Sequence, residues 1–116
     1  MVEKSETIDA MLSEVGAALP ESHVAYAKRD PELFASYLAW RDTCLSDGAI
    51  SRTQKLLMVV ALLTAQKSAE AMRVYASIAL SQGASPAELK EALRVGVLFS
   101  GGSGIHAAAS IEDLLA

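Results

Sequence analysis

The chain has 116 residues, of which 52% are hydrophobic, 21% charged and only 5% aromatic, and its formal net charge is −4. This length is that of one small domain, so we expect residues 1–116 to form a single domain with its own core. An acidic chain without a cluster of Lys and Arg lacks the basic surface that nucleic-acid binding requires. The apolar share is high for a small domain, and we expect assembly into a homo-oligomer to cover part of it.

Neither the first residues nor the apolar runs show a targeting or membrane-spanning signal. Residues 1–6 mix both charges and lead into no apolar core of a signal peptide. The longest apolar run, 56–63, is far shorter than the about 20 residues needed to cross a bilayer. We therefore expect a cytoplasmic protein without a membrane partner. The single cysteine, Cys44, cannot form an internal disulfide, and we interpret it as a small hydrophobic residue on a helix, with a reactive or cross-linking thiol as the alternative.

Almost every segment repeats its apolar residues with the 3.6-residue period of a helix, so the sequence predicts an all-α fold. A first helix is expected over 7–18 and a short second one over 21–28. Asp30 and Pro31 then open a third helix, as its N-cap and its first helical residue. The apolar side chains of this third helix are expected on one face: they are Leu33, Phe34, Tyr37, Leu38 and Trp40.

The segment 51–66 predicts a central helix. Ser51 and Gln54 are spaced as a capping box, in which each side chain bonds the backbone N–H of the other residue. The residues from Leu56 to Ala65 are apolar around nearly the whole helix, and such a helix is buried on all sides. We therefore expect its own subunit to cover one face and a neighbouring subunit to cover the other.

The next helix is expected from Ser68 to Gln82, with Gly83 as a left-handed C-terminal cap. Within it, Glu70 and Arg73 are three residues apart and are expected to form a solvated ion pair.

Two more helix signals complete the chain. The run Ser85-Pro86-Ala87-Glu88 predicts a second capping box with Pro at the first helical position. Gly101-Gly102 should end that helix, and Ser103 is expected to cap a last helix that carries apolar residues up to Leu115. The inner face of the penultimate helix is expected to hold Leu89, Ala92, Leu93 and Gly96.

The order of these parts resembles the carboxymuconolactone decarboxylase and alkylhydroperoxidase D superfamily over roughly residues 30–116. The matching motifs are Leu33-Phe34-x-x-Tyr37, then Arg52-x-x-Lys55-x-Leu57, then Gly83-Ala84-Ser85-x-x-Glu88-x-x-Glu91-Ala92. The resemblance implies a helical bundle of about six to seven helices that assembles into a trimer or hexamer, with pockets near subunit contacts.

The thiol peroxidases of this superfamily carry a Cys-x-x-Cys-x-x-x-His motif, which would fall here on Ser68, Ala71 and Tyr75. Their relay glutamate would fall on Leu56. Serine has no redox couple and alanine cannot resolve a sulfenic acid, so a thiol peroxidase is disfavoured. The decarboxylase branch also lacks the cysteine pair, although it has a histidine at Tyr75 and an asparagine at His106.

Several polar side chains are candidate site residues. Ser68, Met72 and Tyr75 share one helix face, where Tyr75 either donates a hydrogen bond to a ligand or merely reaches solvent. His106 follows the glycine break, where a neutral imidazole can act as acid or base near pH 7 or be simply polar. Arg52 opposes the helix dipole and therefore pairs with an acidic residue or with a carboxylate ligand.

We therefore expect a carboxymuconolactone decarboxylase-like protein without a cofactor, either a lyase for, or a binder of, a small organic acid or lactone. Tyr75 and His106 are the expected catalytic residues, and Arg52, Ser68 and Met72 the expected ligand-binding residues. The alternative is a non-catalytic oligomeric member of the family that serves binding or assembly. No metal site is expected, because neither histidine has a carboxylate cluster beside it.

Overall fold

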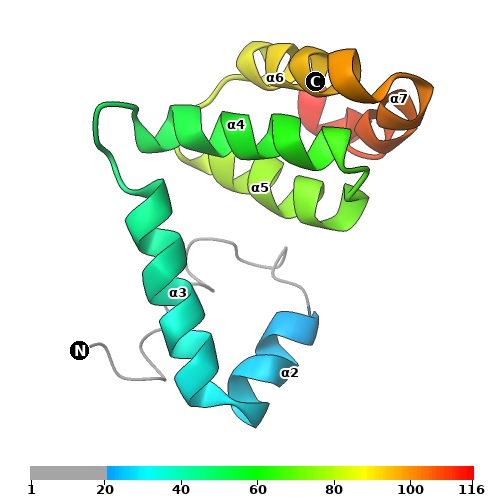
Figure 1. Ribbon diagram of the computed structural model, residues 1–116. Coiled ribbons are helices and arrows are strands. Elements are labelled where there is room, and N and C mark those ends of the chain that lie inside the picture. The colour runs from blue at the N-terminus through cyan, green and yellow to red at the C-terminus, as the bar shows by residue number, and fades with distance from the viewer. Residues whose placement is uncertain (1–20) are drawn as a thin grey trace. The chain divides into compact units, whose positions relative to one another are not determined.

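The computed structural model describes residues 21–116, and all regular elements in this range are helices (Figure 1). The all-α prediction is confirmed for this part of the chain, whereas the helix expected over 7–18 lies outside the described residues. The chain divides into two compact units, residues 1–46 and 47–116. The prediction that both belong to a single domain stays a prediction. No helix in the described range is long and apolar enough to span a bilayer.

The first unit contains α2 (Glu21–Arg29) and α3 (Pro31–Leu45). Asp30 caps α3 as predicted, because its carboxylate accepts a hydrogen bond from the backbone N–H of Leu33 at 3.1 Å. The two helices bury one side chain of α2 and three of α3: Ala27, Phe34, Leu38 and Leu45.

The expectation that all apolar side chains of α3 share one face is wrong for two of them. Leu33 is 50% exposed and Trp40 is 68% exposed. Neighbouring residues on a helix point about 100° apart, so Leu33 diverges from Phe34 and Trp40 points almost opposite to Leu38.

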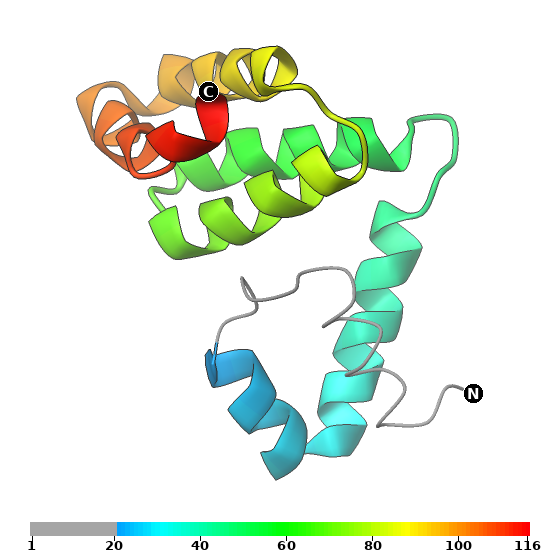
Figure 2. The same cartoon turned by 180° about the vertical axis from the view of Figure 1, so that it is seen from behind.

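The second unit consists of four α-helices and a 3₁₀ turn. In chain order they are α4 (Arg52–Ala65), α5 (Ala69–Ser81), α6 (Pro86–Ser100), α7 (Gly102–Ala109) and η2 (Glu112–Leu115). Helix α4 packs most extensively against α6 and α5, and α7 and η2 close the unit beside α6 (Figures 1 and 2). The core of the unit, called here the core cluster, is formed by Val60, Met72, Ala76, Leu89, Leu93, Ala107 and Ile111.

The predicted helix starts in this unit are confirmed where the signal is local. The Ser51 and Ser85 hydroxyls accept hydrogen bonds from the backbone of Gln54 and Glu88, each at 3.1 Å, and both reciprocal bonds are present. Gly83, with a φ of 103°, takes the left-handed conformation that was expected after α5.

The prediction for the last helix is wrong at both ends. Its N-cap is Gly101 and not Ser103, whose hydroxyl instead donates to the carbonyl of Ser100 at 3.1 Å. The helix ends at Ala109, and the chain continues as the 3₁₀ turn η2. Arg73 of α5 donates to the carbonyl of Ser110 at 3.0 Å, which satisfies a carbonyl that a longer helix would use for its own backbone.

Within one chain, helix α4 is covered along one face and exposed on the other, and coverage of the exposed face by a neighbouring subunit stays a prediction. Leu56, Val60 and Thr64 are fully buried, whereas Met58 is 53% exposed and Leu62 is 60% exposed. The buried residues follow a four-residue spacing, so the chain itself covers one stripe of the helix.

Helices α4 and α6 approach closely at Gly96. A Cβ atom at this position would lie 2.5 Å from the carbonyl oxygen of Ala61 and 2.6 Å from the Cβ of Thr64. The absence of a side chain therefore sets both the spacing and the register of the two helices.

Candidate functional site

The first candidate residues lie along one flank of α5. Ser68 is the N-cap of this helix, and its side chain makes no capping hydrogen bond. Tyr75 follows two turns later, and both residues are partly buried. The seven-residue spacing places the two side chains on the same flank, as the sequence predicts.

Met72 belongs to the core cluster and has no exposed surface. The single hydroxyl proton of Thr64 is shared between two acceptors, the carbonyl oxygen of Val60 at 2.8 Å and the Met72 sulfur at 3.0 Å. The thioether therefore packs between α4 and α5, and Met72 supplies an apolar layer beneath the α5 flank.

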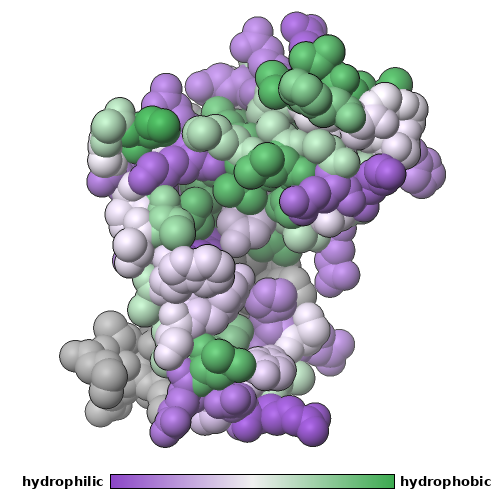
Figure 3. Space-filling model, in the orientation of Figure 1, coloured by the Kyte–Doolittle hydropathy of each residue, from purple (hydrophilic) through white to green (hydrophobic). Residues whose placement is uncertain are grey.

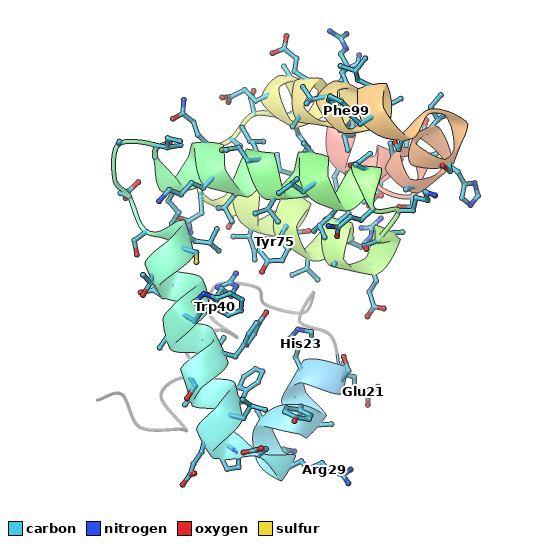
Figure 4. The ribbon with its side chains drawn as sticks, in the orientation of Figure 1. Glu21, His23, Arg29, Trp40, Tyr75 and Phe99 are labelled. Carbon is cyan, nitrogen blue, oxygen red and sulfur yellow. The ribbon has the colours of Figure 1, made fainter. Side chains whose placement is uncertain are left out.

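Tyr75 packs against the core cluster while part of its side chain stays exposed. In Figure 4 its ring lies on one side of α4, and Phe99 of α6 lies on the other. A phenol in this setting offers a hydroxyl group at the edge of an apolar surface.

His106 lies on the exposed side of α7. Within residues 21–116, no hydrogen bond or ring contact joins His106 to Tyr75. The structure therefore does not bring the two side chains into direct contact, and a cavity shared by both stays a prediction.

Arg52 is the first residue of α4 and is partly buried. Its backbone N–H donates to the carboxylate of Asp47 at 2.7 Å. This carboxylate lies at the N-terminus of α4, where a negative charge is favoured by the helix dipole. This bond uses the Arg52 backbone and not its guanidinium group, so the expected pairing of the Arg52 side chain with an acidic residue or a ligand carboxylate stays a prediction.

The ion pair of the second unit is not the predicted one. Arg73 pairs with Asp113 instead of Glu70, with 3.1 Å between Nη1 and Oδ2. The hydrogen bond from Arg73 lowers the pKa of the Asp113 carboxyl, and the same hydrogen bond raises the pKa of Arg73. Both groups are solvent-exposed, so we assign this pair the role of fixing η2 against α5.

The first unit contains a groove that was not predicted from the sequence. Its volume is about 660 Å³, within the range of small-molecule sites. The chain has two Phe, three Tyr and one Trp, and four of these six aromatic residues line this groove. The lining residues are Ser22, His23, Tyr26, Leu33, Phe34, Ser36, Tyr37 and Trp40.

Aromatic side chains that contact one another form part of the walls of the groove. The His23 ring meets Phe34 and Tyr37 edge-on, with 6.4 Å between ring centroids in each case. Figure 4 shows His23 on α2 and Trp40 on α3. The sequence signal was the concentration of aromatic residues between positions 26 and 40 in a chain with few of them. Such walls suit a flat ring ligand.

In the range that the structure describes, no three His, Cys, Asp or Glu side chains gather as a metal-binding group.

A comparison with known families identifies a match. The model described as the carboxymuconolactone decarboxylase family matches residues 31–112, from the start of α3 into η2. This range covers more than half of the chain. No curated protein and no solved structure matches the chain significantly.

Proposed function

Because the chain belongs to the carboxymuconolactone decarboxylase family, we propose that it acts on a small organic acid or lactone without a cofactor, as a lyase or as a binder. The proposed site is the α5 flank, with Tyr75 as the central group and Ser68 beside it. Met72 provides the apolar layer beneath.

The observation that supports this proposal is the position of Tyr75. Its ring packs against the core cluster, so the hydroxyl lies at the edge of an apolar surface. A hydrogen bond from such a hydroxyl to a carbonyl or carboxylate gains strength because water is partly excluded. Tyr75 also stands where the superfamily resemblance puts a relay histidine.

Two further side chains complete the proposed site. His106 is the proposed acid–base group, and its side chain is exposed on α7. Arg52 supplies a permanent positive charge for the ligand carboxylate. A lyase needs all three groups around one ligand, whereas a binder needs only Tyr75 and Arg52.

A calorimetric titration with small lactones that carry a carboxylate tests this site. Replacing Tyr75 by Phe removes one hydroxyl and should weaken binding by about fivefold, the equivalent of about 1 kcal/mol. The matched control is Tyr26→Phe in the first unit, which should bind as the unchanged protein does. Release of carbon dioxide in the same samples identifies a lyase, and binding without release identifies a binder.

A second candidate function is non-catalytic binding of a flat ring compound between α2 and α3. The gathering of four aromatic residues around a groove of about 660 Å³ favours it. Under this candidate, Trp40→Ala abolishes most of the binding because the ligand loses a stacking surface, and Tyr75→Phe changes nothing. The two variants therefore have opposite expected effects under the two candidates.

A further inference from the structure

The groove between α2 and α3 is aromatic and carries no permanent charge. The described residues that line it include no Asp, Glu, Lys or Arg. Figure 4 shows Glu21 and Arg29 of α2 pointing away from the space into which His23 and Trp40 point. In Figure 3, pale to green residues cover the middle of α3, and purple, hydrophilic residues lie at the end of the unit where α2 joins α3. The groove therefore suits an uncharged ligand, since a charge taken out of water needs an opposite charge beside it.

The two serine hydroxyls of the groove already have partners in the first unit. Ser36 donates to the carbonyl of Glu32 at 3.1 Å, within its own helix. The Oγ atom of Ser22 lies 3.4 Å from Nδ1 of His23, and the tautomer of the imidazole decides which of these two atoms donates. The imidazole is therefore the polar group of the groove whose hydrogen bonds need closer inspection.

The imidazole of His23 is held in place and has one ring nitrogen left for a ligand. Its ring meets Phe34 and Tyr37 edge-on, and the contact of Nδ1 with Ser22 fixes it further. Within residues 21–116, the Nε2 atom of this half-buried side chain makes no hydrogen bond. A ligand that supplies a partner to Nε2 therefore gains a hydrogen bond in a site where water is partly excluded.

A hydroxyl is the ligand group that fits this nitrogen. Nε2 accepts a hydrogen bond when the imidazole proton is on Nδ1, and it donates one when the proton is on Nε2. A hydroxyl can both donate and accept, so it pairs with either tautomer, whereas a carbonyl pairs with only one of them. A carboxylate would bring a charge that the lining residues do not neutralise.

We propose that the groove between α2 and α3 binds a phenol, an uncharged aromatic compound whose hydroxyl bonds Nε2 of His23 and whose ring packs against Trp40. The phenol site rests on the second candidate function and adds to it the class of ligand and the residue that selects it. Trp40 is 68% exposed and Tyr26 is 44% exposed, so both have free ring surface for a ligand. The volume of about 660 Å³ is enough for a phenol with more than one ring.

Titration of the full chain with three probes that share the same pair of rings tests the proposal: para-phenylphenol, biphenyl and para-phenylbenzoate. Trp40 is the only tryptophan of the chain, so a change in tryptophan emission reports on the groove. The phenol should bind about fivefold more tightly than biphenyl, because it makes one more hydrogen bond. The benzoate should bind most weakly, because its carboxylate would lose water without gaining an opposite charge.

Replacing His23 by Phe keeps a ring beside Phe34 and Tyr37 and removes both ring nitrogens. His23→Phe should bind para-phenylphenol and biphenyl equally, so the fivefold preference is lost while binding of the hydrocarbon remains. Ser36→Ala is the matched control within the groove, because the Ser36 hydroxyl is already used inside α3, and it should keep the preference. Circular dichroism shows whether each variant retains its helices.

The comparison of probes in the unchanged protein decides the proposal even if His23→Phe does not fold. Equal binding of the phenol and biphenyl, or a full preference in folded His23→Phe, would overturn the role of His23 and leave ring binding standing. Loss of the preference in Ser36→Ala would assign the hydroxyl to Ser36 instead. No change in emission with any probe would remove the second candidate function as well. A Trp40 emission that shifts on dilution of the protein alone would assign the groove to a second copy of the chain.

Discussion

The absence of a side chain at Gly96 allows α4 and α6 to approach each other closely. A methyl group there would overlap the carbonyl oxygen of Ala61 and the Cβ of Thr64, both of which are held in α4. Gly96→Ala should therefore lower the free energy of unfolding by about 1–3 kcal/mol, the usual cost of overpacking. Urea denaturation measures the change. Gly102→Ala is the control, because a Cβ added at Gly102 would meet no neighbouring heavy atom within 4 Å, and it should not destabilise the protein.

The exposed ion pair between Arg73 and Asp113 gives a pH-dependent prediction. Because Arg73 lowers the pKa of Asp113 in the folded protein, the pair stabilises the fold above the usual pKa of a carboxyl group. This contribution is lost as the pH falls through the lowered pKa. Asp113→Asn should therefore lower the melting temperature slightly at neutral pH, and the difference from the unchanged protein should vanish in acid.

Glu112→Gln is the control for this experiment, because Glu112 is an exposed carboxylate of the same 3₁₀ turn without an ion pair in residues 21–116. It should leave the melting temperature unchanged at both ends of the pH range. A constant difference between Asp113→Asn and the unchanged protein across that range would rule out a role for the Asp113 charge.

Arg73 shows why the partner of a side chain is harder to predict than the helix on which that side chain lies. Glu70 is three residues from Arg73, and local spacing alone favours that pair. The actual partner, Asp113, is 40 residues away and is brought close only by the fold, in which η2 packs against α6. The groove around His23 was missed for a related reason, since its walls come from two helices and no single helix shows the pattern.

At the scale of the elements, the serine caps give a direct comparison. The Ser85 hydroxyl accepts a hydrogen bond from the Glu88 backbone, whereas the Ser68 side chain caps nothing in α5. Ser85→Ala should therefore lower the free energy of unfolding by about 1 kcal/mol, and Ser68→Ala should leave it nearly unchanged. Thermal or urea denaturation of the two variants checks this. Equal losses in both would show that the cap geometry does not determine the stability of these helices.

Helix starts were predictable from sequence because a cap and its partner lie within four residues. Asp30, Ser51 and Ser85 all begin helices as expected. The end of α7 was not predictable, since it depends on Arg73 of α5 binding the carbonyl of Ser110. The exposure of Met58 also escaped prediction, because composition shows that α4 is apolar but not which stripe the rest of the chain covers.

At the scale of the whole molecule, many apolar side chains of the described residues lie in one of two places. One part of them fills the core cluster between α4, α5, α6 and α7. Another part lies exposed on α4 and α6, at Met58, Leu62, Val95, Leu98 and Phe99. Oligomerisation was expected from composition alone, but composition does not identify the surface, because the exposed stripes become visible only when the register of α4 against α6 is known.

The two candidate ligand sites lie in different units of the chain. The α5 flank with Tyr75 belongs to residues 47–116, and the aromatic groove belongs to residues 1–46. Family membership covers parts of both units and does not by itself select one of them. A measurement that reports on each helix separately is therefore needed to locate the ligand.

Hydrogen–deuterium exchange of backbone amides, with and without a saturating carboxylate-bearing lactone, tests the central claim most directly. A ligand that binds at Tyr75 and Arg52 should slow exchange in α5 and in the first turn of α4, because local opening of these helices becomes less frequent in the complex. Exchange in α2 and α3 should stay the same. Slowed exchange confined to α2 and α3, or no change in any helix at saturation, would contradict the proposed site.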